Sequence, residues 1–244
     1  MNLSQLKQKD IIDLGGAVSG GLDSCTVIHW LNSQGMNVYA YTVDLGQPDE
    51  DSVDSVIQRM LTCGAVEAEI IEGKDQLAKG GLKVIQSQAR YEGGYWNTTG
   101  IARPITTAAI LGRLKEKGIG IFFHGATGRG NDQVRFQLAA NMIQPEIEVY
   151  APWRDQEYLK QFPGRQQMLD YCEVNGLPIK SRSIARYSTD ANFLGLTHEA
   201  GDLENLENMI AYTMPFKVKG WVPTLEARSH ETGKFMGLAF PQEC

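Results

Sequence analysis

The sequence predicts an α/β fold in which a parallel sheet carries helices on both faces. Short segments rich in strand-forming residues alternate with longer segments of helical periodicity along the first half of the chain. Parallel neighbours need crossover connections, which helices supply. Two glycine-rich turns, residues 19–24 and 125–132, each follow an apolar strand and precede a helix. Ligands of open parallel sheets bind beyond the carboxyl ends of the strands, so these turns predict one shared site.

The individual elements follow from local patterns. Pro104 is expected in the first turn of its helix, and Gly35 and Gly64 are expected to end theirs. Gly15 and Gly16 weaken the first predicted strand. We expect strands at residues 11–18, 38–43, 68–71, 119–123 and up to 154, helices at 23–34, 50–63, 77–85, 104–117, after 132 and up to 176, a polar stretch at 187–199, and a hairpin around 231–234. A domain boundary is expected near residue 165.

Composition limits the class of protein. A chain of 244 residues with 42% hydrophobic and 21% charged residues can bury a full core. Its net charge of -6 argues against a broad nucleic-acid footprint, which needs clustered Lys and Arg. The N-terminal residues lack the apolar run of a signal peptide, and no uncharged stretch is long enough to span a bilayer. We therefore expect a cytoplasmic protein that binds neither nucleic acid nor membranes.

Cysteine and histidine positions suggest no structural metal. The four cysteines form no CxxC pair, and His198-Glu199 is not followed by a second His at the spacing of a helical zinc site. Reduced thiols are the simplest interpretation. The cysteines are Cys25, Cys63, Cys172 and Cys244.

The stretch from Ala17 to Cys25 is interpreted as a phosphate cradle. Gly20 and Gly21 leave backbone N–H groups uncovered, Ser19 and Ser24 add hydroxyl donors, and the following helix directs its positive end at the same anion. No Lys-Ser or Lys-Thr pair follows the glycines, and GxGxxG is missing, which disfavours both common nucleotide folds. On this turn alone, a tight strand-to-helix connection would explain the glycines equally well.

The wider pattern resembles a known family. Ser-Gly-Gly-Leu-Asp-Ser after a strand resembles the pyrophosphate loop of the ATP pyrophosphatases. Residues 17–25, 39–47, 125–136, 187–190 and 197–199 together resemble the argininosuccinate synthase family in order and spacing. The resemblance covers the chain to about residue 210, weakens through the tail and then stops, whereas members of that family are longer.

The resemblance implies a HUP-like, Rossmannoid ATP pyrophosphatase domain at residues 1–165 and the beginning of an α+β synthetase domain at 166–244. It also implies an ATP- and Mg²⁺-dependent ligation. The ureido oxygen of citrulline attacks the α-phosphate, pyrophosphate leaves, and the amine of aspartate displaces AMP to give argininosuccinate in arginine biosynthesis. The family forms homotetramers. Catalysis would consist mainly of positioning and electrostatics, not of a protein nucleophile.

The resemblance further implies roles for particular residues. Ser19, Asn131 and Asp132 would be catalytic. Residues expected at ATP are Ala17, Val18, Ser19, Gly20, Gly21, Leu22, Asp23, Ser24, Cys25, Val43, Gly125, Thr127, Asp132 and Asp190. Aspartate would contact Thr127, Asn131 and Asp132. Citrulline would contact Tyr95, Asn131, Arg135, Ser188, Thr197 and Glu199. No side chain is assigned to Mg²⁺, which would arrive with ATP.

Several alternatives stay open. Each of three residues has a structural alternative when it is considered without the resemblance. Asp132 would cap the helix that follows it, Arg135 would be a surface cation, and Asp190 would be a turn residue. Three residues depart from the family pattern: Ser24-Cys25 stands where Thr-Ser is usual, and Val43 stands where Ala is usual. The functional alternatives are a related adenylating ligase with another ureido or amide acceptor, and a non-catalytic ATP-binding fragment or subunit. A tRNA-thiolating pyrophosphatase shares the loop, but it would need a basic face.

Overall fold

The computed structural model describes residues 1–47, 53–90, 96–128, 130–179, 188–199, 221–228 and 235–241. The chain forms two compact units. The first unit comprises Met1–Val43, Ser52–Ile71 and Arg103–Arg182, and the second comprises Asp44–Asp51, Glu72–Ala102 and Ser183–Cys244. The domain boundary expected near residue 165 stays a prediction.

A five-stranded sheet organises the first unit, with strand order β3-β2-β1-β4-β5. The pairs β1/β2, β1/β4 and β4/β5 are parallel, which confirms the predicted fold class. From β1 the chain proceeds outward to β3 and then returns to place β4 on the other side of β1. The strand order therefore reverses between β1 and β4, where ligands of such sheets bind. The strands are β1 Asp13–Ala17, β2 Asn37–Asp44, β3 Glu67–Glu72, β4 Ile121–His124 and β5 Glu148–Tyr150.

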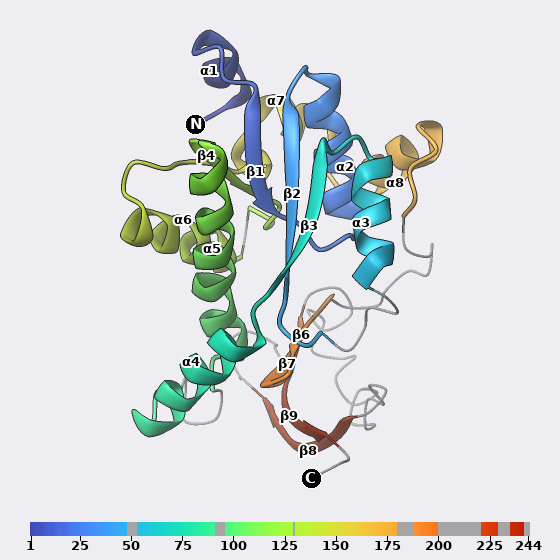
Figure 1. Ribbon diagram of the computed structural model, residues 1–244. Helices are drawn as coiled ribbons and strands as arrows, with labels where there is room; N and C mark the ends of the chain where they lie inside the picture. The colour runs from blue at the N-terminus through green and yellow to red at the C-terminus, as the bar shows by residue number, and fades with distance from the viewer. Residues whose placement is uncertain are drawn as a thin grey trace. The chain divides into compact units, whose positions relative to one another are not determined.

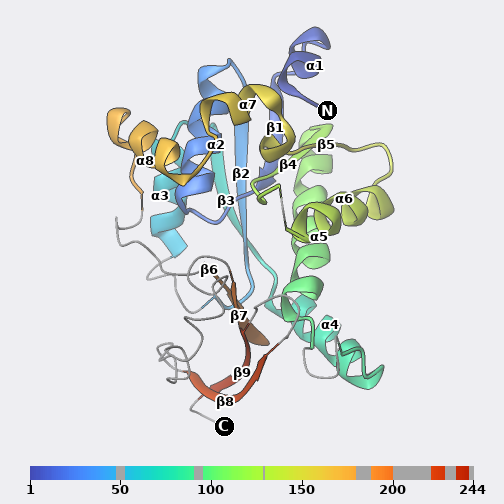
Figure 2. The same ribbon diagram turned by 180° about the vertical axis from the view of Figure 1, so that it is seen from behind.

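Helices cover both faces of this sheet, with α2 and α3 on one side and α5 and α6 on the other (Figures 1 and 2). Successive side chains of β4 point to opposite faces of the sheet, each toward one of the two helix layers. Ile121 and Phe123 belong to the core that contains α2, whereas the Phe122 ring lies 6.0 Å from that of Phe136 in α6. The helices are α1 Leu3–Gln8, α2 Leu22–Ser33, α3 Val53–Thr62, α5 Thr98–Lys117, α6 Asp132–Ile143, the 3-10 turn η1 Pro152–Arg154, α7 Gln156–Gln161 and α8 Arg165–Val174.

Gly15 and Gly16 make close packing around β1 possible. A Cβ on Gly15 would lie 2.2 Å from Cδ2 of Leu114, and a Cβ on Gly16 would lie 2.1 Å from the carbonyl oxygen of Phe123. Any larger residue would therefore push α5 or β4 away from the strand. The glycines that weaken the strand pattern in the sequence are required by the close approach of its neighbours.

The expected position of Pro104 is wrong. Helix α5 begins at Thr98, so Pro104 lies inside the helix instead of in its first turn. Proline cannot donate to the carbonyl four residues earlier, and here that residue is Gly100, which has no Cβ to add crowding. Thr98 and Thr99 are buried, so packing holds the helical turn that local sequence preference does not predict.

The second unit contains α4 (Lys74–Gln86) and a four-stranded sheet of order β6-β7-β9-β8. The expected tail hairpin is confirmed, since β8 (Trp221–Arg228) and β9 (Phe235–Pro241) pair antiparallel; residues 229–234 lie outside the described part. The stretch 187–199, whose sequence indicates only a polar character, contains a second hairpin made of β6 (Ser188–Asn192) and β7 (Gly195–Glu199).

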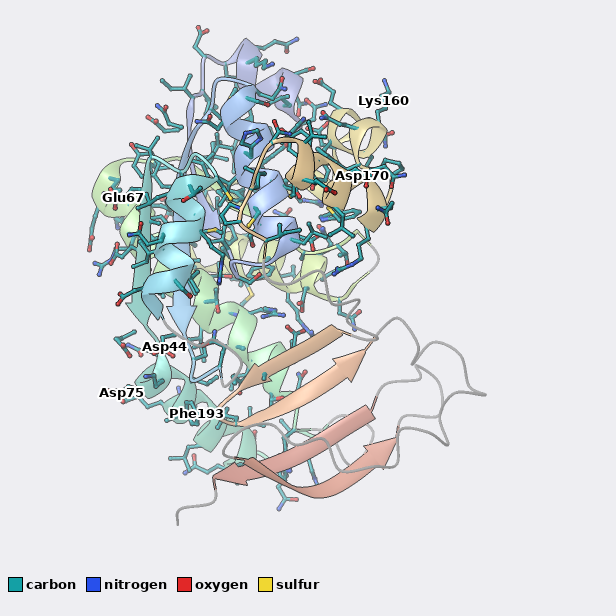
Figure 3. The ribbon with its side chains drawn as sticks, turned by 90° about the vertical axis from the view of Figure 1, so that its right-hand side faces the viewer. Asp44, Glu67, Asp75, Lys160, Asp170 and Phe193 are labelled. Atoms are coloured by element: carbon teal, nitrogen blue, oxygen red, sulfur yellow. The ribbon has the colours of Figure 1, made fainter. Side chains whose placement is uncertain are left out.

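The turn between β6 and β7 packs inside the second unit. The N–H of Phe193 donates to the carbonyl of Leu45 at 3.0 Å. In Figure 3, the labelled side chain of Phe193 lies in the same region as that of Asp44, the residue before Leu45. A Cβ on Gly81 of α4 would lie 2.8 Å from Cδ1 of Leu194. The hairpin is thereby fixed to both α4 and the end of β2. Within the described ranges, no helix is long and apolar enough to cross a membrane.

Candidate functional site

The first turn, residues 19–24, leaves β1 and enters α2. Gly20 has a φ of 74°, a left-handed conformation that glycine adopts without strain. The N–H of Ser19 donates to Oγ of Ser24 at 2.9 Å, and the two hydroxyl oxygens are 3.3 Å apart. Gly21 is the N-cap of α2 and offers no side chain to its N–H groups. The hydroxyl groups of Ser19 and Ser24 and the first N–H groups of α2 lie together at the positive N-terminal end of this twelve-residue helix. Such an arrangement binds anions.

Asp23 puts a carboxylate into this otherwise anion-binding turn. Burial raises the pKa of Asp23, and the neighbouring Trp153 indole and the charge of Arg165 offset this only in part. Oδ1 of Asp23 and Nε1 of Trp153 are buried and have no hydrogen-bond partner of good geometry among the described residues. A carboxylate oxygen in this position suits a cation that would accompany bound phosphate.

The second turn, residues 125–132, leaves β4 beside the first. The Nε2 amide of Gln133, in α6, donates to the carbonyl of Ala126 at 2.5 Å and so links the turn to the helix that follows it. A Cβ on Gly128 would lie 3.0 Å from the carbonyl oxygen of Trp153. The backbone of Trp153 thus touches the second turn while its indole lies beside Asp23 of the first. The structure brings the two predicted turns together at the point where the strand order reverses.

Two arginines hold Asp132, the first residue of α6. Arg103 contacts Oδ2 through Nε at 2.8 Å and Nη2 at 2.7 Å, and Nη1 of Arg135 donates to Oδ1 at 2.9 Å. Burial would raise the pKa of Asp132, but the charges and hydrogen bonds of Arg103 and Arg135 outweigh it and hold the pKa below its ordinary value. Asp132 is therefore ionised and fixed, and it orients both guanidinium groups.

His124 ends β4, directly before the second turn. Its ring is fully buried and stacks on Phe136, with centroids 4.8 Å apart and planes inclined by 18°. Burial, together with the charges of Arg154 and Arg103, lowers the pKa of His124 to about 4. The imidazole is neutral at neutral pH, and neither ring nitrogen has a partner among the described residues.

Buried polar atoms without partners gather around the two turns. Such atoms are rare in folded proteins, and each needs an explanation such as a bound ligand or water. Among the described residues they include both ring nitrogens of His124 and Oε1 of Gln133. Oδ1 of Asp23 and Nε1 of Trp153 also belong to this group, since they are neighbours without a hydrogen bond of good geometry. No group of three or more His, Cys, Asp or Glu side chains in that part of the chain is arranged to hold a metal by itself. The arrangement can hold a polar, anionic ligand together with a cation.

The β6-β7 hairpin carries four further predicted site residues. Ser188 pairs with Glu199, and Asp190 pairs with Thr197. Opposite residues of an antiparallel pair share a face, as do residues two apart along one strand, so all four positions lie on the same face of the hairpin. Thr197 is buried, with its hydroxyl oxygen 3.4 Å from that of Thr99 within the second unit.

The remaining predicted residues have the following places. Ala17 ends β1, Val43 is buried near the end of β2, and Asn131 is the N-cap of α6 without a side-chain cap bond. Cys25 is buried in the first full turn of α2, with Sγ 3.8 Å from the carbonyl oxygen of Pro178. Tyr95 lies outside the described residues.

Three residues of the site were not singled out from the sequence: Arg103, His124 as a site residue, and Trp153. Arg103 is separated by 29 positions from the carboxylate it holds, so no local spacing indicates the contact. The only available signals were an arginine directly before a proline and a histidine at the end of an apolar strand. The sequence pattern predicts a strand up to residue 154, which is wrong: β5 ends at Tyr150, and Trp153 lies in the 3-10 turn η1. Its contacts with both turns depend on tertiary packing.

The parallel sheet, with its switch point and glycine turns, defines a HUP-type α/β domain. The chain belongs to the argininosuccinate synthase family, because residues 14–178 match the family described as "Arginosuccinate synthase N-terminal HUP domain". This confirms the resemblance seen in the sequence. The chain is also 42% identical to the argininosuccinate synthase of Rhodopirellula baltica over 192 residues, which are 78% of this chain and 47% of that protein. It therefore spans about half the length of this relative.

Solved structures show a more distant likeness. NMN synthetase from Francisella tularensis has a TM-score of 0.45 at 10% identity, covering 72% of this chain and 67% of that one. Glutamine-dependent NAD+ synthetase from Acinetobacter baumannii, in complex with ADP, has a TM-score of 0.42 at 11% identity, covering 50% of this chain and 23% of that one. A likeness of this size does not bear on function.

Proposed function

We propose that the protein catalyses the ATP-dependent ligation of citrulline and aspartate to argininosuccinate, with release of AMP and pyrophosphate, in the cytoplasm. The observation that carries this proposal is the first turn at the switch point between β1 and β4. There Gly20 is left-handed, Ser19 and Ser24 present hydroxyl groups, and the N-terminus of α2 is uncapped by a side chain. Membership of the argininosuccinate synthase family supplies the substrates.

The first step would form a bond between the ureido oxygen of citrulline and the α-phosphorus of ATP. The bond from that phosphorus to the bridging oxygen breaks, and pyrophosphate leaves with the electron pair. The N–H groups at the start of α2 and the Ser19 and Ser24 hydroxyl groups would stabilise the growing negative charge. Val43, at the end of β2, would border the adenine.

Mg²⁺ fits the first turn because of Asp23. A phosphate-binding turn that contains a buried carboxylate repels its ligand unless a cation neutralises the pair. Oδ1 of Asp23 is buried beside the Trp153 indole and makes no hydrogen bond of good geometry among the described residues. Bound Mg²⁺ would supply charge neutralisation for the leaving pyrophosphate. Asp23 would hold the ion together with phosphate oxygens.

In the second step the amine of aspartate attacks the activated ureido carbon, and AMP leaves. Thr127, Asn131 and Asp132 would position the aspartate, while Arg135 would orient a substrate carboxylate. The ion pairs with Arg103 and Arg135 support this role, since they fix the carboxylate of Asp132 before any substrate binds. On the hairpin, Ser188, Thr197 and Glu199 would bind citrulline with Tyr95, and Asp190 would contact ATP. A homo-oligomer, tetrameric as in the family, belongs to the same proposal.

The experiment is an assay of the full chain with ATP, Mg²⁺, citrulline and aspartate, with AMP and pyrophosphate measured separately. We expect equal release of both products that depends on both amino acids, and a loss of about 10- to 100-fold in the Ser19→Ala variant. Citrulline-dependent exchange of labelled pyrophosphate into ATP, measured without aspartate, isolates the first step. Release by the wild type no greater than by Ser19→Ala would contradict the proposal.

A further inference from the structure

An arginine of α3 lies against the first turn. A Cβ placed on Gly20 would be 2.9 Å from Nη2 of Arg59, 3.4 Å from its Nε and 3.1 Å from Cγ1 of Val56. The guanidinium group therefore packs directly on the bare backbone of the left-handed glycine. Arg59 and Gly20 both belong to the first unit, so this contact lies within one compact body.

The inner face of α3 holds Arg59 in this position. Val56, Met60 and Cys63 are all buried in the core of the first unit, and they flank Arg59 along the helix. The charge of Arg59 also reaches the start of α2. The hydrogen bond from the Cys63 thiol lowers the pKa of Cys25, and Arg59 lowers it further while burial acts in the opposite direction.

The first turn has no lysine to meet phosphate charge, yet a pyrophosphate leaving group carries several negative charges. Its own carboxylate, Asp23, adds another. A guanidinium presents paired donors that match phosphate oxygens and stays charged at any physiological pH. Of the cations near the turn, Arg59 has its guanidinium against the turn's backbone, whereas Arg165 is indicated only by its effect on Asp23.

We propose that Arg59 binds the β- and γ-phosphates of ATP and holds the pyrophosphate as it leaves. This inference rests on the proposed function for the identity of the ligand. Arg59 is then a binding residue contributed by a helix that follows β2, outside both glycine-rich turns. The competing role is packing alone, in which the aliphatic part of the side chain covers Gly20 and the charge is irrelevant.

The test is direct binding of Mg²⁺-pyrophosphate and of AMP to the full chain by calorimetry. Arg59→Met keeps the aliphatic stem and removes the charge. Arg59→Lys keeps a charge without the planar pair of donors. Arg113→Met serves as the matched control, because it removes another guanidinium of the first unit, one that is paired with Glu69 at 2.9 Å.

We expect Arg59→Met to weaken pyrophosphate binding by about 10- to 100-fold, since a charged hydrogen bond of this type has that effect. Arg59→Lys should lose about 3- to 10-fold, and Arg113→Met should bind as the wild type does. AMP affinity should stay unchanged in all variants. Pyrophosphate affinity unchanged in Arg59→Met, or AMP affinity reduced equally, would overturn the inference.

This design separates the inference from the proposed function. Pyrophosphate binding needs no turnover, so a chain that binds pyrophosphate through Arg59 but releases no AMP would refute only the ligation. A chain that turns over with an unaffected Arg59→Met variant would refute only the role of Arg59. Thermal unfolding of each variant shows that the fold is retained, and Arg59→Lys provides the comparison if Arg59→Met does not fold.

Discussion

The two glycine-rich turns follow neighbouring strands, and each leads into a helix that has an aspartate in its first turn, yet their electrostatics are opposite. In the first turn, burial raises the pKa of Asp23. In the second, Arg103 and Arg135 overcome the effect of burial and hold the pKa of Asp132 below its ordinary value. The second turn carries its own counter-charges, whereas the first needs a ligand or ion to balance its carboxylate. The difference is that the second turn is electrostatically balanced by side chains of the chain itself and the first is not.

The largest expected effect concerns His124, at the entrance to the second turn. The folded chain keeps this imidazole neutral down to about pH 4, whereas an ordinary histidine takes up a proton near 6.5. The wild type should therefore lose stability as pH falls from 6.5 to 4, by about 3 kcal/mol at 1.36 kcal/mol per pKa unit. Urea unfolding across this range should show a clearly smaller loss for His124→Phe. Equal pH slopes in both proteins would mean that the second turn is wetter than its burial indicates.

A smaller loss of stability is expected when Arg103 and Arg135 lose the carboxylate of Asp132. Asp132→Asn leaves two guanidinium groups without their carboxylate, and we expect it to lower the free energy of unfolding by about 2 kcal/mol at pH 7. The difference should be full above pH 3.8 and should vanish as pH falls through the lower folded-state pKa. Denaturant titrations at pH 7 and at a series of values below pH 3.8 check this. A variant as stable as the wild type at pH 7 would remove the contrast between the turns.

The smallest effect has the opposite sign and belongs to the first turn. Because the pKa of Asp23 is raised, its ionised form opposes folding, and Asp23→Asn should stabilise the ligand-free chain by about 1 kcal/mol at pH 7. The gain should fade as pH falls towards 3.8. The same variant should bind ATP and Mg²⁺ more weakly, measured by calorimetry. Destabilisation at pH 7 together with unchanged ATP binding would show that Asp23 is a structural residue.

Sequence patterns predicted the sheet because short segments rich in strand-forming residues alternate with longer segments of helical periodicity. They also located both turns, since the chemistry of a phosphate cradle is local. The ion pair between Arg103 and Asp132 escaped prediction because Arg103 reaches Asp132 from another helix, α5, over a sequence separation of 29 residues that has no periodic signature. The spacing in the sequence predicts Arg135 about one helical turn after Asn131, and the structure confirms this position in α6.

Two elements were predicted incompletely for physical reasons. Helix α5 starts before Pro104 because buried Thr98 and Thr99 stabilise a turn that the proline pattern disfavours. The β6-β7 hairpin has few strand-forming residues, and packing of its turn against Leu45 and Gly81 stabilises it instead. That hairpin places four predicted residues on one face, a relation that only the register reveals.

Trp153 gives the site an optical reporter. Its backbone lies against the second turn and its indole beside Asp23 of the first, so the emission of this one residue samples the environment of both. Protonation of Asp23, or binding of Mg²⁺ or pyrophosphate at the first turn, would each change the polarity and charge around the indole. A variant in which Trp30, Trp96 and Trp221 are replaced by phenylalanine would leave Trp153 as the sole tryptophan. Its fluorescence would then follow the filling of the first turn in real time, without a label.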